Sequence, residues 1–174
     1  MIAMIAKGDQ FPNFKYKDRK AGDFVTIDFK SEIKGKKVIL FGLPGAFTPT
    51  CSTYQLPGFD KLMSKFNQLG IDDIYCTSVN DPFVMNAWLE KQDIKNVKSL
   101  PDGNGDLAVQ LGMMVQKKNV NFGSRSWRYA MVVDGSTGTV LEVFPEEGFG
   151  DNAETDPYEV SKPEAVLKWA MKNL

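Results

Sequence analysis

The candidate nucleophiles of this chain are two cysteines, Cys51 and Cys76, and the chain contains no histidine. Two cysteines alone cannot build a tetrahedral zinc site, which takes four Cys or His ligands, and we expect no metal or organic cofactor. Without histidine, the Cys–His and Ser–His–Asp arrangements that activate a nucleophile are excluded. A reactive thiol in this protein must therefore be activated by something other than an imidazole.

Cys51 lies where a predicted strand is followed by a predicted helix. The apolar run Lys37–Leu43 is typical of a strand buried on both faces, and a helical pattern runs from about Cys51 to Leu69. The first turn of a helix has unsatisfied N–H groups and partial positive charge, so a cysteine there has a lowered pKa and reacts as the thiolate. The alternative from position alone is an inert cysteine packed near a turn, because free cysteine is among the most buried residue types.

The turn before Cys51 supplies polar and rigid residues. The hydroxyl of Thr48, three residues earlier, can donate a hydrogen bond to the sulfur or to a bound oxygen. Pro44 and Pro49 would stiffen the turn and keep solvent from the pocket. The turn therefore predicts a shielded thiol with a hydroxyl beside it.

The other elements predict an α/β fold in which a mixed central sheet is flanked by helices. Asp81 and Pro82 form an N-cap and first-position proline for a helix through Leu89. Further strands are expected over Phe24–Phe29 and Ile74–Val79, a short helix over Asp106–Leu111, a hairpin over Arg128–Val133 and Thr139–Phe144, and a last helix opened by a capping box at Ser161–Glu164. This order is that of the thioredoxin-like architecture, and we expect one domain over residues 1–174.

Composition excludes several function classes. The net charge is −1, with no basic patch, so a nucleic-acid partner is not expected. The longest apolar runs are too short to span a bilayer, and the N-terminus lacks the features of a signal peptide, so we expect a cytoplasmic protein with no membrane partner. The acidic stretch Asp151–Asp156 is interpreted as a solvated loop, and Trp88 and Trp127 as core or interface residues.

Three blocks of the sequence carry a more specific resemblance. The first is Pro44-Gly45-Ala46-Phe47-Thr48-Pro49-Thr50-Cys51-Ser52 with Leu56-Pro57-Gly58-Phe59, the second is Ser78–Met85 with Ala87-Trp88, and the third is Arg128–Val133. Together they resemble the peroxiredoxin family, in its peroxiredoxin 5 or type II branch. The resemblance implies a thioredoxin-like fold, reduction of hydrogen peroxide and organic hydroperoxides by a thiol, and a homodimer packed near the loops Pro44–Phe47 and Asp81–Phe83.

The resemblance also assigns roles to single residues. Cys51 matches the cysteine that attacks the peroxide, Thr48 the threonine that hydrogen-bonds it, and Pro44 the proline that shields the sulfur. Arg128 matches the arginine that stabilises the thiolate and polarises the peroxide, although Arg125 is a nearby competitor. These roles agree with the chemistry, because negative charge moves from sulfur to the leaving oxygen and one fixed donor at that charge contributes about 3 kcal/mol. The product is a sulfenic acid.

The chain departs from the family pattern in two places. Gln55 stands where histidine is usual, and we expect reduced tuning of the pocket without loss of activity. No cysteine follows Cys76, so a late resolving cysteine is impossible, and Cys76 itself is expected to be a buried strand residue. We therefore expect a one-cysteine cycle in which glutathione with glutaredoxin, or thioredoxin, reduces Cys51.

Two other functions fit the same fold. A thiol–disulfide oxidoreductase normally uses a Cys-x-x-Cys pair, whereas Cys51 is followed by Ser52-Thr53-Tyr54, which disfavours this chemistry. A peroxide-sensing or chaperone-like binding protein, in which oxidation of Cys51 changes a partner interaction, remains as the alternative. The rate of reaction with peroxide distinguishes it from an enzyme.

Overall fold

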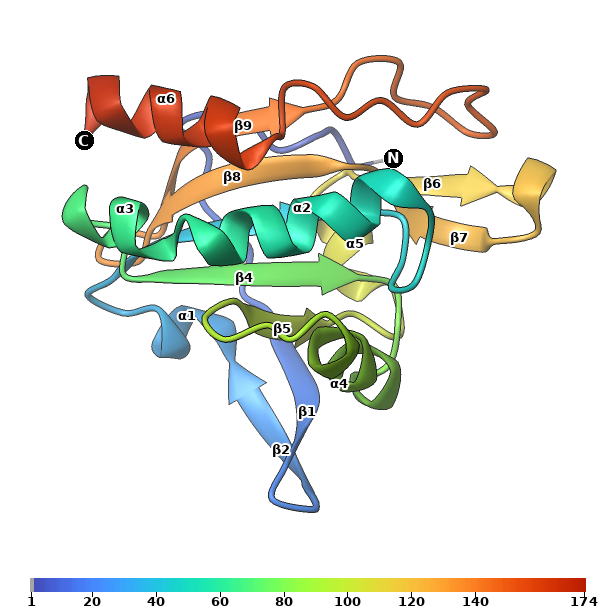
Figure 1. Cartoon of the computed structure of the whole chain (residues 1–174), viewed down its shortest axis with the longest axis horizontal. Coiled ribbons are helices and arrows are strands. Elements are labelled where there is room, and N and C mark those ends of the chain that lie inside the picture. Colours follow the sequence, from blue (N-terminus) through green and yellow to red (C-terminus); the bar gives the residue numbers. More distant parts are fainter. Residues whose placement is uncertain (1) are drawn as a thin grey trace.

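A five-stranded mixed sheet forms the centre of the computed structural model, which describes residues 2–174, except for the side chains of Thr50 and Cys51 (Figure 1). The strand order is β5 (Lys98–Pro101), β4 (Asp73–Ser78), β3 (Lys37–Gly42), β8 (Tyr129–Asp134) and β9 (Thr139–Pro145). β3, β4 and β5 are parallel, while β8 runs antiparallel to both β3 and β9. The predicted α/β class with a mixed, thioredoxin-like central sheet is confirmed.

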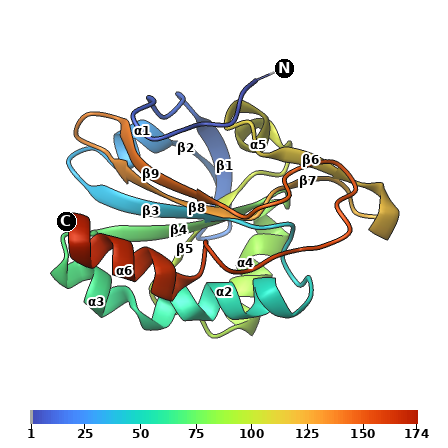
Figure 2. The same cartoon turned by 90° about the horizontal axis from the view of Figure 1, so that it is seen from above.

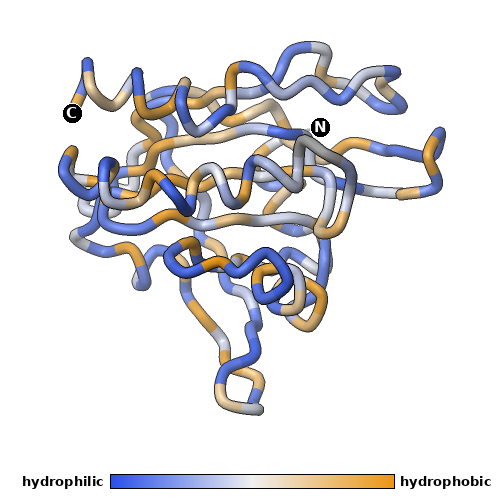
Figure 3. Tube along the Cα trace, in the orientation of Figure 1, coloured by the Kyte–Doolittle hydropathy of each residue, from blue (hydrophilic) through white to orange (hydrophobic). Residues whose placement is uncertain are grey.

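The two faces of the sheet carry separate apolar cores. Figure 2 shows the elements that cover each face, and Figure 3 shows the hydropathy along the chain. Along β3, Ile39 and Phe41 point into one core and Val38 and Leu40 into the other, as the two-residue period of a strand requires. The first core is covered by α2 (Thr50–Lys61), α3 (Met63–Gln68), α4 (Pro82–Lys91) and α6 (Pro163–Asn173). The second is covered by the hairpin β1 (Lys15–Lys20) and β2 (Asp23–Asp28), by α1 (Phe29–Glu32) and by α5 (Asp106–Gln110).

A smaller hairpin lies at one end of the sheet. It consists of β6 (Met114–Lys117), the 3-10 turn η1 (Lys118–Val120) and β7 (Gly123–Ser126). The long segment between β9 and α6 runs past this hairpin in both views (Figures 1 and 2). This segment, residues 146–161, contributes to the site described below and is called the β9–α6 loop.

Most predicted elements are present, with three differences. The helix expected from Cys51 to Leu69 is two helices that meet at Leu62, and α2 continues through Pro57. β1, α1, β5, β6, η1 and β7 were not predicted. The capping box at Ser161 is wrong, because the Ser161 hydroxyl donates to the buried carboxylate of Glu146 at 2.6 Å and α6 has no side-chain cap.

Several local signals were interpreted correctly. The Asp81 carboxylate accepts a hydrogen bond from the Val84 amide at 2.9 Å and caps α4, which begins at Pro82. Trp88 and Trp127 are both buried core residues.

The part of the chain that the structure describes contains no helix with the length and apolar character of a membrane span.

Candidate active site

The start of α2 provides the environment predicted for Cys51. Cys51 is the second residue of α2; its side chain lies outside the described residues. The N-cap is Pro49, which offers no side-chain hydrogen bond, and the first turn contains no acidic residue. The partial positive charge at this helix end is therefore not offset by a capping carboxylate, and it favours an anion there.

A chain of hydrogen bonds joins Thr48 to Arg128 through Ser52. An Nη2–H of Arg128 donates to the Ser52 hydroxyl oxygen at 3.2 Å, and the Ser52 and Thr48 hydroxyl oxygens are 2.9 Å apart. Thr48 also lies 2.6 Å from the Gly45 carbonyl, which can only accept. The single Thr48 proton is thus engaged by the Gly45 carbonyl and the Ser52 hydroxyl, so that the Thr48 oxygen keeps a lone pair for an incoming O–H group.

Arg128 is held on several sides although it is almost completely buried. Its side chain is 1% exposed, and its Nη1 donates to Gln55 Oε1 at 2.9 Å. Its Nε and Nη2 donate to the two carboxylate oxygens of Asp156 at 3.3 and 2.7 Å. The ring of Tyr158 lies 5.8 Å from the guanidinium carbon. These contacts fix the plane of the guanidinium.

Gln55 connects Arg128 to the β9–α6 loop. Its amide nitrogen donates to the carbonyl and the hydroxyl oxygens of Ser161 at 3.2 and 3.3 Å, and the side chain is completely buried. Ser161 in turn donates to Glu146. Sequence reasoning noticed Gln55 only as a departure from a family pattern, and it missed the roles of Ser52 and Asp156 altogether.

The turn that contains Pro44 is fixed by two other contacts. Arg125 donates from Nη1 to the Pro44 carbonyl at 3.0 Å and from Nε to the Phe122 carbonyl at 3.2 Å. The Ala46 amide donates to Asn80 Oδ1 at 2.9 Å, at the end of β4. The contacts of Arg125 are thus with the turn backbone, whereas Arg128 reaches Thr48 through Ser52. Burial lowers the pKa of Arg125.

A cavity of about 180 Å³ adjoins these residues. Pro44 and Thr48 form part of its wall, together with Phe122 from the β6–β7 hairpin and Glu154 and Asp156 from the β9–α6 loop. The aromatic residue of this wall is Phe122, whereas Phe47 of the preceding turn is 57% exposed and is not among the described lining residues of this cavity.

Cys76 is a core residue, as predicted. It lies in β4 opposite Phe41 of β3, is completely buried, and packs in the core under α2 and α4. Burial raises the pKa of the Cys76 thiol far above its usual value, an effect that Arg128 only partly offsets. The Cys76 thiol in this position is protonated at neutral pH.

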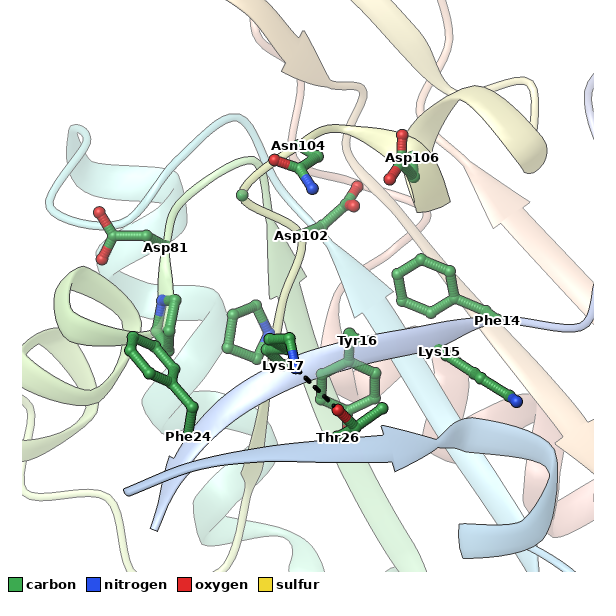
Figure 4. Close-up of a pocket in the computed structure, with 13 residues that line it drawn as sticks. Phe14, Lys15, Tyr16, Lys17, Phe24, Thr26, Asp81, Asp102, Asn104 and Asp106 are labelled. Carbon is green, nitrogen blue, oxygen red and sulfur yellow. Dashed lines mark hydrogen bonds between the residues drawn. The ribbon is translucent and has the colours of Figure 1, made fainter. Parts of the chain in front are cut away.

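A second, larger cavity of about 390 Å³ lies beside the β1–β2 hairpin (Figure 4). Aromatic side chains such as Phe14 and Phe24 form one side, and Asp102 and Asp106 lie on the other (Figure 4). Asp102 accepts hydrogen bonds from the Leu107 and Ala108 amides, and burial raises its pKa to about 6. None of the predicted site residues is among the described lining residues of this cavity. The Asp102 carboxylate binds amides in the first turn of α5.

Comparison with known proteins agrees with this arrangement. The Redoxin family model matches residues 6–158. A peroxiredoxin of Rhizobium etli is 54% identical over 158 residues, which is 90% of this chain and 83% of the relative. The hybrid peroxiredoxin hyPrx5 of Haemophilus influenzae is 41% identical over 94% of this chain and 65% of its own length.

Solved structures give the same result. The Plasmodium falciparum antioxidant protein, described as a 1-Cys peroxiredoxin, has a TM-score of 0.89 with 34% identity, covering 97% of this chain and 100% of the other. Reduced Prx3 of Vibrio vulnificus in complex with hydrogen peroxide has a TM-score of 0.85 with 36% identity, covering 96% and 99%. The fold is therefore that of a thioredoxin-like redox protein. The chain belongs to the peroxiredoxin family, in its peroxiredoxin 5-like or type II branch, whose members are thiol-dependent peroxidases.

Proposed function

We propose that Cys51 is the cysteine that reduces hydroperoxides in this protein. The observation that carries the proposal is the position of Cys51 in the uncapped first turn of α2, one residue before Ser52, which links Thr48 to Arg128. The helix end and the arginine both favour the thiolate. Hydrogen peroxide and small organic hydroperoxides are the proposed substrates, and the Vibrio vulnificus relative was solved with hydrogen peroxide.

The reaction is a displacement at oxygen. The Cys51 thiolate attacks one peroxide oxygen, the S–O bond forms as the O–O bond breaks, and the leaving oxygen takes up a proton to become water or an alcohol. Two electrons pass from sulfur to the peroxide, and Cys51 becomes a sulfenic acid. Negative charge thus develops on the leaving oxygen, where fixed hydrogen-bond donors lower the barrier.

Three neighbours have defined tasks in this step. The lone pair of Thr48 accepts the O–H of the peroxide and orients it, while Arg128 supplies a permanent positive charge with directed N–H groups. Pro44 forms part of the cavity wall and limits access of water to the sulfur. Arg125 holds the Pro44 carbonyl, so its task is to shape the turn.

We assign the reduction of the sulfenic acid to an external thiol. A thiol attacks the sulfenic sulfur, water leaves, and the mixed disulfide is reduced by a second thiol. Glutathione with glutaredoxin, or thioredoxin, would supply these thiols. The assignment is supported by Cys76, which lies in the core with a raised pKa, and by the 1-Cys description of the Plasmodium falciparum relative.

The proposed form of the protein is a cytoplasmic homodimer. The family resemblance supports a contact at the Pro44–Phe47 and Asp81–Phe83 loops, where Phe47 and Phe83 are 57% and 58% exposed. Exposed aromatic side chains of this kind are typical of interface residues. Sedimentation analysis of the wild type and of a Phe47→Ser, Phe83→Ser double variant tests this, because only the variant is expected to be monomeric.

The function is tested by peroxide consumption with defined reductants. Wild type, Cys51→Ser and Cys76→Ala are assayed with glutathione plus glutaredoxin and, separately, with thioredoxin plus its reductase. Turnover must vanish in Cys51→Ser and persist in Cys76→Ala. Turnover that is lost in Cys76→Ala would contradict the one-cysteine cycle. Fast oxidation of Cys51 without turnover by any thiol would instead favour a peroxide-sensing protein.

A further inference from the structure

The β9–α6 loop is anchored at its base by one buried carboxylate. Glu146, 2% exposed, accepts hydrogen bonds from the amides of Glu159, Val160 and Ser161 at 2.8 to 3.3 Å. The two ends of a loop of more than ten residues are thereby tied together. Buried carboxylates that accept several amide hydrogen bonds hold loops firmly.

The same loop is anchored a second time at the β6–β7 hairpin. Asp151 accepts from the Gln116 amide at 2.8 Å, and Asn152 accepts from the Lys118 and Asn119 amides at 2.9 and 3.1 Å. Asp151–Asp156 was interpreted from sequence as a solvated acidic loop. Much of it is exposed, but that interpretation did not include its hydrogen bonds to the hairpin. A loop fixed at both places presents the residues between them in a defined position.

Asp156 is the residue that this loop presents to the site. Its two oxygens face Nε and Nη2 of Arg128, an arrangement in which one carboxylate meets one edge of the guanidinium. Asp156 is 44% exposed while Arg128 is 1% exposed, and Asp156 also lines the 180 Å³ cavity. A molecule in the cavity therefore meets the Asp156 carboxylate before it reaches the Arg128 guanidinium.

The other charged groups of the cavity do not reverse this effect. Glu154 adds a second carboxylate to the wall. Lys117 also lines the cavity, but it is 6% exposed and its Nζ lies 5.8 Å from the Trp127 ring centre. The apolar part of the wall comes from Val120 and Phe122. The cavity thus offers an apolar surface with an acidic rim.

We propose that Asp156 is a specificity-determining residue, which makes this site prefer neutral hydroperoxides to hydroperoxides that carry a carboxylate. The proposal rests on the proposed peroxidase function. Asp156 offsets the charge of Arg128 toward the cavity, while Arg128 keeps its Nη2 contact with Ser52, the residue next to Cys51. A carboxylated substrate meets repulsion from Asp156 where an unpaired arginine would attract it.

The test compares two substrates that differ only in charge. Cumene hydroperoxide and its para-carboxylate are mixed separately with the reduced wild type, and the second-order rate constant of Cys51 oxidation is measured for each. In Asp156→Asn, the ratio of the carboxylated to the neutral rate constant is expected to rise about fivefold. Asp156→Glu keeps the wild-type ratio. Glu147→Gln removes one charge from the same loop at an exposed residue that is neither an anchor of the loop nor part of the described cavity lining, and it is the matched control.

A second measurement needs no variant. Repulsion between the substrate carboxylate and Asp156 is screened by salt, so raising the ionic strength is expected to increase the wild-type rate with the carboxylated substrate only. A rate that falls with salt would show attraction and overturn the proposal, as would an unchanged ratio in Asp156→Asn. If the wild type oxidises slowly with both substrates and with hydrogen peroxide, the peroxidase function itself is wrong.

Discussion

Replacing Gln55 by leucine tests whether the buried amide positions the arginine. Gln55 accepts from Arg128 with its oxygen and donates to Ser161 with its nitrogen. Leucine has a similar volume and can do neither. The change leaves a buried guanidinium N–H and a buried carbonyl without these partners.

The size of the effect follows from these lost bonds. A hydrogen bond to a charged group contributes about 1.5 to 3 kcal/mol, and an unsatisfied buried group costs about 1 to 3 kcal/mol. We expect Gln55→Leu to lower the free energy of unfolding by about 3 kcal/mol. Because Arg128 loses one of its fixed contacts, the rate of peroxide reduction is expected to fall about tenfold, equivalent to about 1.4 kcal/mol.

Gln55→His is the matched control. A neutral imidazole accepts with one nitrogen and donates with the other, as the glutamine amide does. It should recover most of the rate and stability, which would also explain why either residue suits this position. Urea unfolding and stopped-flow oxidation are measured for all three proteins. The reasoning is refuted if Gln55→Leu loses stability but keeps its rate, or if histidine performs no better than leucine.

Four further changes probe separate parts of the account. Arg128→Met is expected to lower the stopped-flow rate with hydrogen peroxide by a factor of about 100. Arg128→Lys is expected to recover little of this rate, because an ammonium cannot match the planar fork of a guanidinium. A wild-type rate in either variant would contradict this. Ser161→Ala removes a partner of Glu146 and should cost about 1 to 2 kcal/mol in urea unfolding, whereas no loss would show that the loop is held elsewhere. Asp102 has a folded pKa of about 6 against 3.8 unfolded, so its ionisation should take about 3 kcal/mol from the stability of the wild type as pH rises from about 4 to 6. Asp102→Asn should lack this contribution, and a pH dependence of urea unfolding that is the same in both proteins would refute the assignment. Cys76→Ala should keep the wild-type rate of Cys51 oxidation, as measured by mass spectrometry of quenched samples, and a slower reaction would mean that Cys76 takes part.

The parts of the fold that were predicted from sequence have strong local signals. β3 is a continuous apolar run, and the Asp81–Pro82 pair begins α4 where expected. β1 was missed because its sequence KYKDRK is mostly charged, and only Tyr16 and Asp18 of it are buried. The capping box failed for a different reason: Glu146, fifteen residues away, takes the hydroxyl that the local pattern assigned to the helix.

In the candidate site, too, local sequence signals were found and long-range contacts were missed. Thr48, Pro44 and Cys51 lie in one short segment, so spacing alone brings them together. Asp156 was not found, because its pairing with Arg128, 28 residues away, depends on how the β9–α6 loop is anchored to the hairpin. Nothing in the acidic composition of that loop distinguishes a carboxylate that binds an arginine from one that faces solvent.

The central claim is that Cys51 is an activated thiolate that reduces hydroperoxides. Stopped-flow tryptophan fluorescence of the reduced protein, mixed with hydrogen peroxide at several concentrations, tests it most directly, with Cys51→Ser measured in parallel. We predict a fast change whose rate rises linearly with peroxide and which is absent in the variant. A reaction no faster than that of a free thiol, or one that persists in Cys51→Ser, would contradict the account.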